Sequence, residues 1–148
     1  MHYKKLAKLE IAERQLFHSI ELYIAGDHLI SAITLAGAAE EILGKLVARK
    51  GKQTALEEKV ETLCKMFEVV FKEPGNRKAF IELRNKARNE LKHIGNGEFA
   101  EMSLEDEVVK LLNRAIKNYK RLKPGHHPIF RDFEKERLRR HKLEVENA

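Results

Sequence analysis

Residues 31–47 read SAITLAGAAEEILGKLV, and this stretch decides the fold. A helix with this sequence is apolar on almost every side, and its many small residues let neighbouring backbones come close. Because Glu40, Glu41 and Lys45 interrupt the apolar run, we interpret it as a buried helix and not as a membrane span. A helix buried on most sides needs other helices around it. The stretch therefore predicts an all-α protein built around a central helix at about 28–49.

The rest of the chain predicts an antiparallel bundle of four to five helices with a charged C-terminal helical arm. Further helices are expected at about 3–25, from Thr54 onward, over 77–97 and over 104–122. The boundary signals are a closing Gly26, a capping Asp27, a capping box of Thr54 and Glu57, and caps at Asn76 and Ser103. We expect residues 1–123 to form the bundle. Residues 124–148, which follow Pro124 and Gly125, should form a peripheral helix or a partly ordered arm.

Two carboxylates on the central helix require an explanation, because a buried charge is costly unless it is paired. One alternative is that Glu40 and Glu41 both lie at an exposed edge of the helix. The other is that one of them supports Arg84 or Arg88 from behind. The sequence leaves both alternatives open.

Residues 77–97 read RKAFIELRNKARNELKHIGNG and predict an amphipathic helix. An apolar stripe at 3-4-4-3 spacing is expected to face the core and contains Phe80, Leu83, Ala87, Leu91 and Ile94. The side chains expected to project away from that stripe are Asn85, Asn89, Lys92 and His93, with Arg88 flanking them. Arg offers fixed donors to phosphoryl oxygens, His exchanges a proton near neutral pH, and Asn can orient an imidazole. This combination suits a phosphate ester.

Residues 88–93, RNELKH, form an R-N-x-x-x-H pattern that resembles the signature of HEPN domains, which are small all-helical proteins and in many cases metal-independent ribonucleases. Residues 31–47 are similar to the second helix of standalone bacterial members, and the resemblance covers roughly residues 1–122. It implies catalytic roles for Arg88, Asn89 and His93. Substrate binding would fall to Lys92, Asn85 and Arg84.

The composition also favours a phosphate-containing partner but does not identify it. The 148-residue chain has a formal net charge of +6, which favours a polyanionic partner such as RNA. Its single cysteine, Cys64, excludes an internal disulfide, and the N-terminus has no apolar run typical of a signal peptide. We therefore expect a cytoplasmic protein that has no membrane partner.

The sequence lacks the motifs of several common classes of enzyme and nucleotide-binding protein. The sequence contains no phosphate-loop, dinucleotide-binding, zinc-protease or hydrolase-elbow motif. The adjacent His126 and His127 are poorly spaced to share one ion, and the 77–97 helix has no acidic pair for Mg²⁺. We therefore expect no metal and no cofactor.

The predicted function is a metal-independent endoribonuclease that cleaves RNA by attack of the ribose 2′-hydroxyl. In this mechanism His93 acts as general base or acid, Arg88 stabilises the transition state, Asn89 orients the imidazole, and Lys92 attracts the phosphate. Family analogy places the protein among toxins or phage-defence components with a possible antitoxin partner. Because Gly95 stands where some family toxins carry a modified Tyr, a nucleotidyltransferase partner is in doubt. The alternative is a non-catalytic helical module that binds a nucleotide, RNA or a partner protein.

The spacing of the motif also predicts a homodimer. Arg88 and His93 are five residues apart, so on one helix they point about 140° away from each other. A two-fold axis near this helix would let Arg88 of one subunit meet His93 of the other, as the family resemblance also implies. The site would then be shared between two chains.

Overall fold

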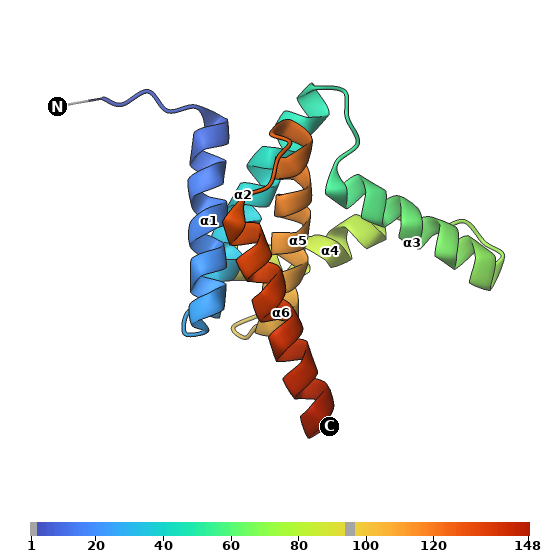
Figure 1. Ribbon diagram of the computed structural model, residues 1–148. Coiled ribbons are helices and arrows are strands. Elements are labelled where there is room, and N and C mark those ends of the chain that lie inside the picture. The colour runs from blue at the N-terminus through green and yellow to red at the C-terminus, as the bar shows by residue number, and fades with distance from the viewer. Residues whose placement is uncertain (1–2, 94–96) are drawn as a thin grey trace.

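A computed structural model describes residues 3–93 and 97–148, and all regular elements in them are α-helices (Figure 1). In chain order they are α1 (Lys8–Ala25), α2 (Leu29–Arg49), α3 (Ala55–Phe71), α4 (Arg77–Lys92), α5 (Leu104–Leu122) and α6 (Pro128–Asn147). The expected all-α bundle is confirmed. The expectations for Ile94 and Gly95 fall outside the described residues.

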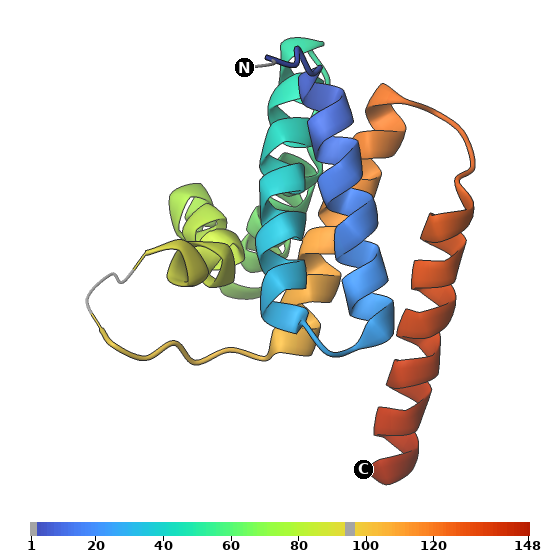
Figure 2. The same ribbon diagram turned by 90° about the vertical axis from the view of Figure 1, so that its left-hand side faces the viewer.

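Helix α2 is the central element, and α1 and α5 pack along it (Figure 2). Its small residues Ala32, Ala36 and Ala39 are fully buried, which lets the neighbouring helices approach closely. Larger side chains from all three helices fill the space between them, including Leu16, Ile20, Ile33, Leu43, Val108 and Leu112. The prediction of a buried central helix is therefore confirmed.

The predicted local signals set four of the helix ends. Gly26 ends α1 in the left-handed conformation, with φ 82°, which glycine adopts without strain. The capping box of Thr54 and Glu57 is present at the start of α3, and the Asn76 and Ser103 side chains accept the expected capping hydrogen bonds. Two boundary predictions are wrong. Helix α1 begins at Lys8, and the N-cap of α2 is His28 without a side-chain hydrogen bond, so Asp27 is not the cap.

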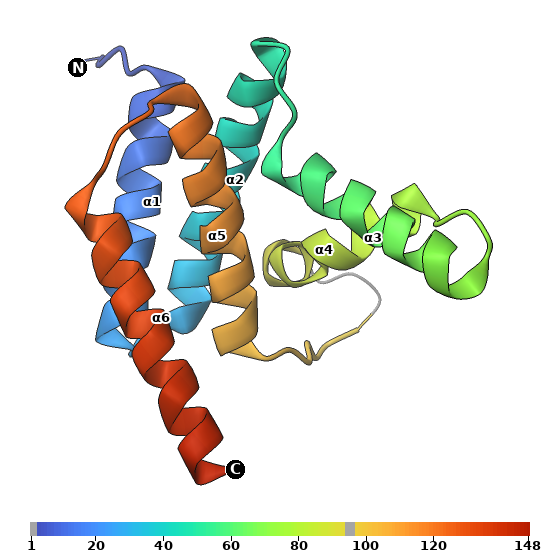
Figure 3. The same cartoon turned by 45° about the vertical axis from the view of Figure 1, so that its right-hand side comes forward.

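Helices α3 and α4 form a hairpin that projects sideways from the bundle (Figure 3). The two helices pack against each other, and α4 also packs against α2 and α3 against α5, but within them only Ala55, Val60 and Ala87 are buried. Large apolar side chains on the hairpin are 59–68% exposed, namely Met66, Val69, Val70, Phe71 and Leu83. The expected core position of Leu83 is therefore wrong, because that side of α4 has no neighbouring helix.

The C-terminal arm is a helix whose first half joins the core. Phe130 and Phe133 of α6 are buried, and Phe133 packs edge-on against Tyr23 of α1 at 5.3 Å between ring centroids. The second half is exposed, including Leu138, Leu143 and Val145. Within residues 124–148 the arm thus forms one helix, α6, whose buried apolar side chains all lie in its first half.

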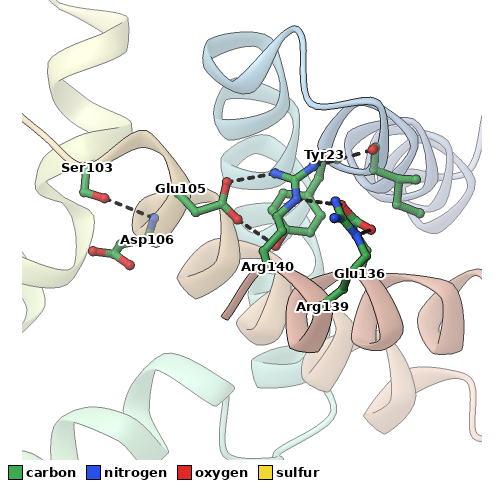
Figure 4. A network of polar contacts seen from close by, with 8 residues as sticks. Tyr23, Ser103, Glu105, Asp106, Glu136, Arg139 and Arg140 are labelled. Carbon is green, nitrogen blue, oxygen red and sulfur yellow. Dashed lines mark hydrogen bonds and ion pairs between the residues drawn. The ribbon is translucent and has the colours of Figure 1, made fainter. Parts of the chain in front are cut away.

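A polar network fixes α6 to α1 and α5 (Figure 4). The Tyr23 hydroxyl donates a 2.8 Å hydrogen bond to Glu105, which also accepts one from Arg140 at 2.8 Å. The Arg140 guanidinium lies 4.3 Å from the centroid of the Tyr23 ring. Burial and the neighbouring Glu105 raise the pKa of Tyr23 above its ordinary value. This network ties the middle of α6 to the bundle through Arg140.

None of the helices in the described part of the chain is long and apolar enough to cross a membrane.

Candidate functional site

One buried carboxylate and two guanidiniums meet where α2, α4 and α5 come together. Glu40 of α2 is 4% exposed. Its Oε2 lies 3.3 Å from Arg88 Nη1, and its Oε1 lies 3.4 Å from Arg114 Nε. The side chains of Arg88 and Arg114 are only 13% and 8% exposed. We call Glu40, Arg88 and Arg114 the buried ion cluster.

The cluster settles the question raised by the acidic pair of the central helix. Glu40 is buried and supports Arg88, which confirms one alternative for this residue. Glu41 is 39% exposed and pairs with Lys45 at 2.9 Å, while lying 3.9 Å from Arg88 and 3.7 Å from Lys92. The two adjacent carboxylates therefore have different surroundings, one inside the protein and one at its edge.

Arg114 was not identified from the sequence, although it links the cluster to the backbone of α4. Its Nη1 donates a 3.2 Å hydrogen bond to the Arg84 carbonyl, and its Nη2 donates a 3.3 Å hydrogen bond to Asn85 Oδ1. Burial lowers the pKa of Arg114, and the negative charge of Glu40 opposes that shift. A sequence signal did exist. Arg114 stands on the buried stripe of α5, between Leu111 and Asn118 at helical spacing.

Gly37 is the residue that allows Arg88 to reach Glu40. A Cβ atom at position 37 would lie 2.7 Å from Arg88 Cγ and 2.8 Å from Arg88 Cδ. The aliphatic part of Arg88 therefore lies directly on the backbone of α2, one turn before Glu40. The small residues of α2 therefore have two effects: they let neighbouring helices approach, and at Gly37 they leave room for the Arg88 side chain.

These contacts correct the expected orientation of α4. Arg84, Asn85 and Arg88 are half-buried and turn toward the bundle, whereas the sequence placed Asn85 on the side away from the core. The physical reason is the buried charge of Glu40, which requires a cationic partner. Leu83 is turned outward as a result.

The other predicted site residues lie at the exposed end of α4. Asn89 and His93 are exposed, and the Lys92 side chain is 36% exposed. The helix ends at Lys92, so His93 has an extended backbone and lies outside the helix that was expected to include it. The His93 backbone N–H donates a 3.1 Å hydrogen bond to the Asn89 carbonyl. A contact between the Asn89 side chain and the imidazole stays a prediction.

His93 and Lys92 line a shallow pocket of about 440 Å³. Among the described residues, the pocket is lined by the end of α4 with His93 and by residues 97–100, namely Glu90, Leu91, Lys92, His93, Gly97, Glu98, Phe99 and Ala100. Arg88 does not line this pocket. Within one chain the structure brings Lys92 and His93 together but holds Arg88 against α2. The part of the chain that the structure describes contains no group of three His, Cys, Asp or Glu residues placed to hold a metal ion.

Fold and site together define an all-helical bundle with a buried ion cluster between α2, α4 and α5 and an exposed Lys-His pocket at the end of α4. Comparisons with models of known protein families, with curated protein sequences and with solved structures give no match for the chain. The HEPN resemblance consequently rests on residues 31–47 and 88–93.

Proposed function

We propose that this protein is a metal-independent endoribonuclease of the HEPN type. The observation that carries the proposal is the combination of an exposed His93-Lys92 pocket with an Arg88 that Glu40 holds in place on α4, one turn before Lys92. A guanidinium that stabilises a transition state must be fixed in advance, and a buried carboxylate supplies that fixation.

The proposed reaction uses the 2′-hydroxyl of the RNA itself. His93 takes the proton of this hydroxyl, and the resulting oxygen attacks the adjacent phosphorus. The bond from phosphorus to the 5′-oxygen of the next nucleotide breaks, and that oxygen receives a proton. The products are a 2′,3′-cyclic phosphate and a free 5′-hydroxyl. Arg88 stabilises the charge on the phosphoryl oxygens in the transition state, and Lys92 attracts the phosphate.

We further propose that two copies of the chain complete the site. Arg88 and His93 of one chain point to different places, so a second copy is needed to bring a guanidinium to each imidazole. The exposed apolar side chains of the α3–α4 hairpin support this, because large exposed apolar patches mark interaction surfaces. A role as a toxin or phage-defence component, with an antitoxin as partner, rests on the resemblance alone.

The test for cleavage uses purified protein with excess EDTA. It should cut RNA, leave DNA of the same sequence intact, and produce cyclic phosphate ends. His93→Ala should lower the rate by about 10²-fold or more. His126→Ala, which removes another exposed imidazole, serves as the matched control and should leave the rate unchanged. Equal cleavage by both variants would exclude His93 as the catalytic base.

The test for a shared site mixes two inactive variants. Arg88→Ala and His93→Ala should each be inactive alone. After co-refolding in equal amounts, about half of the dimers are mixed and hold one intact site each, which restores about a quarter of the wild-type activity. If native mass spectrometry shows mixed dimers and no activity returns, the shared site is wrong.

A second candidate function is a non-catalytic helical module that binds a nucleotide, RNA or a partner protein. The observation that favours it is the ion pair between Arg88 and Glu40, which occupies the guanidinium inside a single chain. Binding of RNA without any cleavage, with cyclic phosphate ends absent, would support this function over the nuclease.

A further inference from the structure

A basic groove runs along α5 on a surface separate from the His93 pocket. Its floor is a stripe of exposed residues at 3-4-3 spacing, Lys110, Asn113, Lys117 and Lys120, with Arg114 beside it. Helix α3 contributes Lys59 and Thr62, and α4 contributes Arg84. Figure 3 shows α5 between α6 on one side and the α3–α4 hairpin on the other. The groove has a volume of about 850 Å³.

The charge of the groove is strongly one-sided. Six of its lining side chains are cationic and two, Glu58 and Glu134, are acidic. Lys117 pairs with Glu58 at 2.8 Å, and Lys110 pairs with Glu107 at 2.8 Å, but both are surface ion pairs that contribute little and yield readily to a stronger anion. Arg114 is also paired, with Glu40 at 3.4 Å, so the groove keeps a net positive charge that its acidic neighbours offset only in part.

Three of these cations make no ion pair with any described residue, namely Lys59, Arg84 and Lys120. In addition, Arg84 Nε is buried and makes no hydrogen bond within the described part of the chain, whereas Arg114 Nε faces Glu40 Oε1 at 3.4 Å. A polyanion in the groove would meet cations from three helices. Asn113 and Thr62 add neutral groups that can donate hydrogen bonds to phosphate or sugar oxygens.

We propose that this groove binds the phosphate backbone of a single RNA strand. The inference rests on the proposed ribonuclease function and names the path by which that substrate is held. The stripe from Lys110 to Lys120 spans about 15 Å along the helix axis, and a stacked strand covers this with about four nucleotides at about 3.4 Å each. The groove lining contains no aromatic side chain. The contacts are therefore to the backbone and independent of base sequence.

The groove lies apart from the site of cleavage. Arg84, which lines the groove, is separated from Lys92 at the pocket by about 12 Å along the axis of α4. A strand bound in the groove is held next to α4, the helix that ends directly before His93. The groove thus supplies affinity, while the pocket supplies chemistry, and the two contributions can be measured separately.

The experiment measures binding without cleavage. The probe is a fluorescein-labelled 2′-O-methyl RNA of twelve uridines, which lacks the attacking hydroxyl, and fluorescence anisotropy follows binding between 50 and 200 mM salt. Lys117→Gln/Lys120→Gln should weaken binding by about tenfold, and it should reduce the slope of log K against log salt by about 1.4 for two lost phosphate contacts. The control, Lys8→Gln/Lys142→Gln, removes two exposed lysines outside the groove and should bind as the wild type does.

Equal weakening by the two double variants would overturn the groove as the binding path, because net charge alone would then explain the affinity. An extended site would be overturned if inorganic phosphate or a mononucleotide displaced the labelled RNA as strongly as the unlabelled strand does. If polyglutamate bound as tightly as the RNA, RNA would be overturned as the ligand of the groove in favour of an acidic protein. If the groove binds the strand as described and no RNA is ever cleaved, the proposed function fails and the groove stands.

Discussion

Replacing Glu40 by Gln tests the buried ion cluster directly, because the change removes one charge and almost no volume. Arg114 then loses its carboxylate, while Arg88 keeps only the more distant Glu41 at 3.9 Å. Breaking a buried ion pair from one side costs about 3–5 kcal/mol. Since Glu41 still offsets part of the charge on Arg88, we predict the lower end, a loss of about 3 kcal/mol from the free energy of unfolding.

The assay is urea unfolding followed by far-UV circular dichroism at one fixed protein concentration. With an m-value of about 2 kcal/mol/M, the predicted loss lowers the midpoint by about 1.5 M. Glu41→Gln is the matched control, because it makes the same chemical change on the next residue. Its side chain is 39% exposed, and its loss should cost about 0.5 kcal/mol.

Free energies of unfolding within about 1 kcal/mol of each other for the two variants would show that Glu40 does not act as a buried partner, since a buried charge must cost more to leave unpaired than an exposed one. A changed m-value would instead show that the native or unfolded ensemble had altered, and the comparison would then be made from thermal unfolding.

Two further predictions concern close packing and acid stability. Gly37→Ala places a methyl group 2.7 Å from Arg88 Cγ and should cost about 1–3 kcal/mol in urea unfolding. Gly44→Ala should stabilise the protein by about 0.5–1 kcal/mol, because a methyl group there meets Asn118 Nδ2 at 3.5 Å, an ordinary contact distance. Equal effects of the two substitutions would contradict the close contact between Gly37 and Arg88. Hydrogen bonding by Arg139 lowers the pKa of Glu136 from 4.5 to about 2. This group stabilises the fold above its unfolded pKa and loses that contribution as the pH falls from 4.5 toward 2. Glu136→Gln should therefore reduce the fall in melting temperature between pH 4.5 and pH 2. An unchanged fall in the variant would contradict a role of Glu136 in acid stability.

Features that depend on neighbouring residues in the sequence were predicted well. The buried character of α2 follows from its composition, and the ends at Gly26 and Thr54 follow from backbone preferences that need no tertiary contact. The N-cap of α2 failed because a cap also depends on the path of the preceding turn, which places His28 and not Asp27 at that position.

The face of α4 that turns inward could be read from its own sequence only in part. The predicted apolar stripe is correct for Ala87, which is buried, and for Leu91, which packs against the core. The inward turn of Arg88 and Asn85 depends on Glu40 and Arg114, which lie on other helices. A buried carboxylate attracts the cationic side of the helix, and Leu83 remains outside. The same pairing decides the placement of Arg88, which the motif alone presented as a solvent-facing group.

The projecting α3–α4 hairpin has a consequence for the order in which the protein loses structure. Helices α1, α2 and α5 share a continuous core, whereas the hairpin buries few apolar side chains of its own. Segments with little buried apolar area open at a lower free energy than the whole domain. The hairpin should therefore exchange its amide hydrogens through a partial opening that leaves the three-helix core intact. Because α4 carries Arg88 and leads to His93, the motif belongs to a cooperative unit less stable than the domain that carries it.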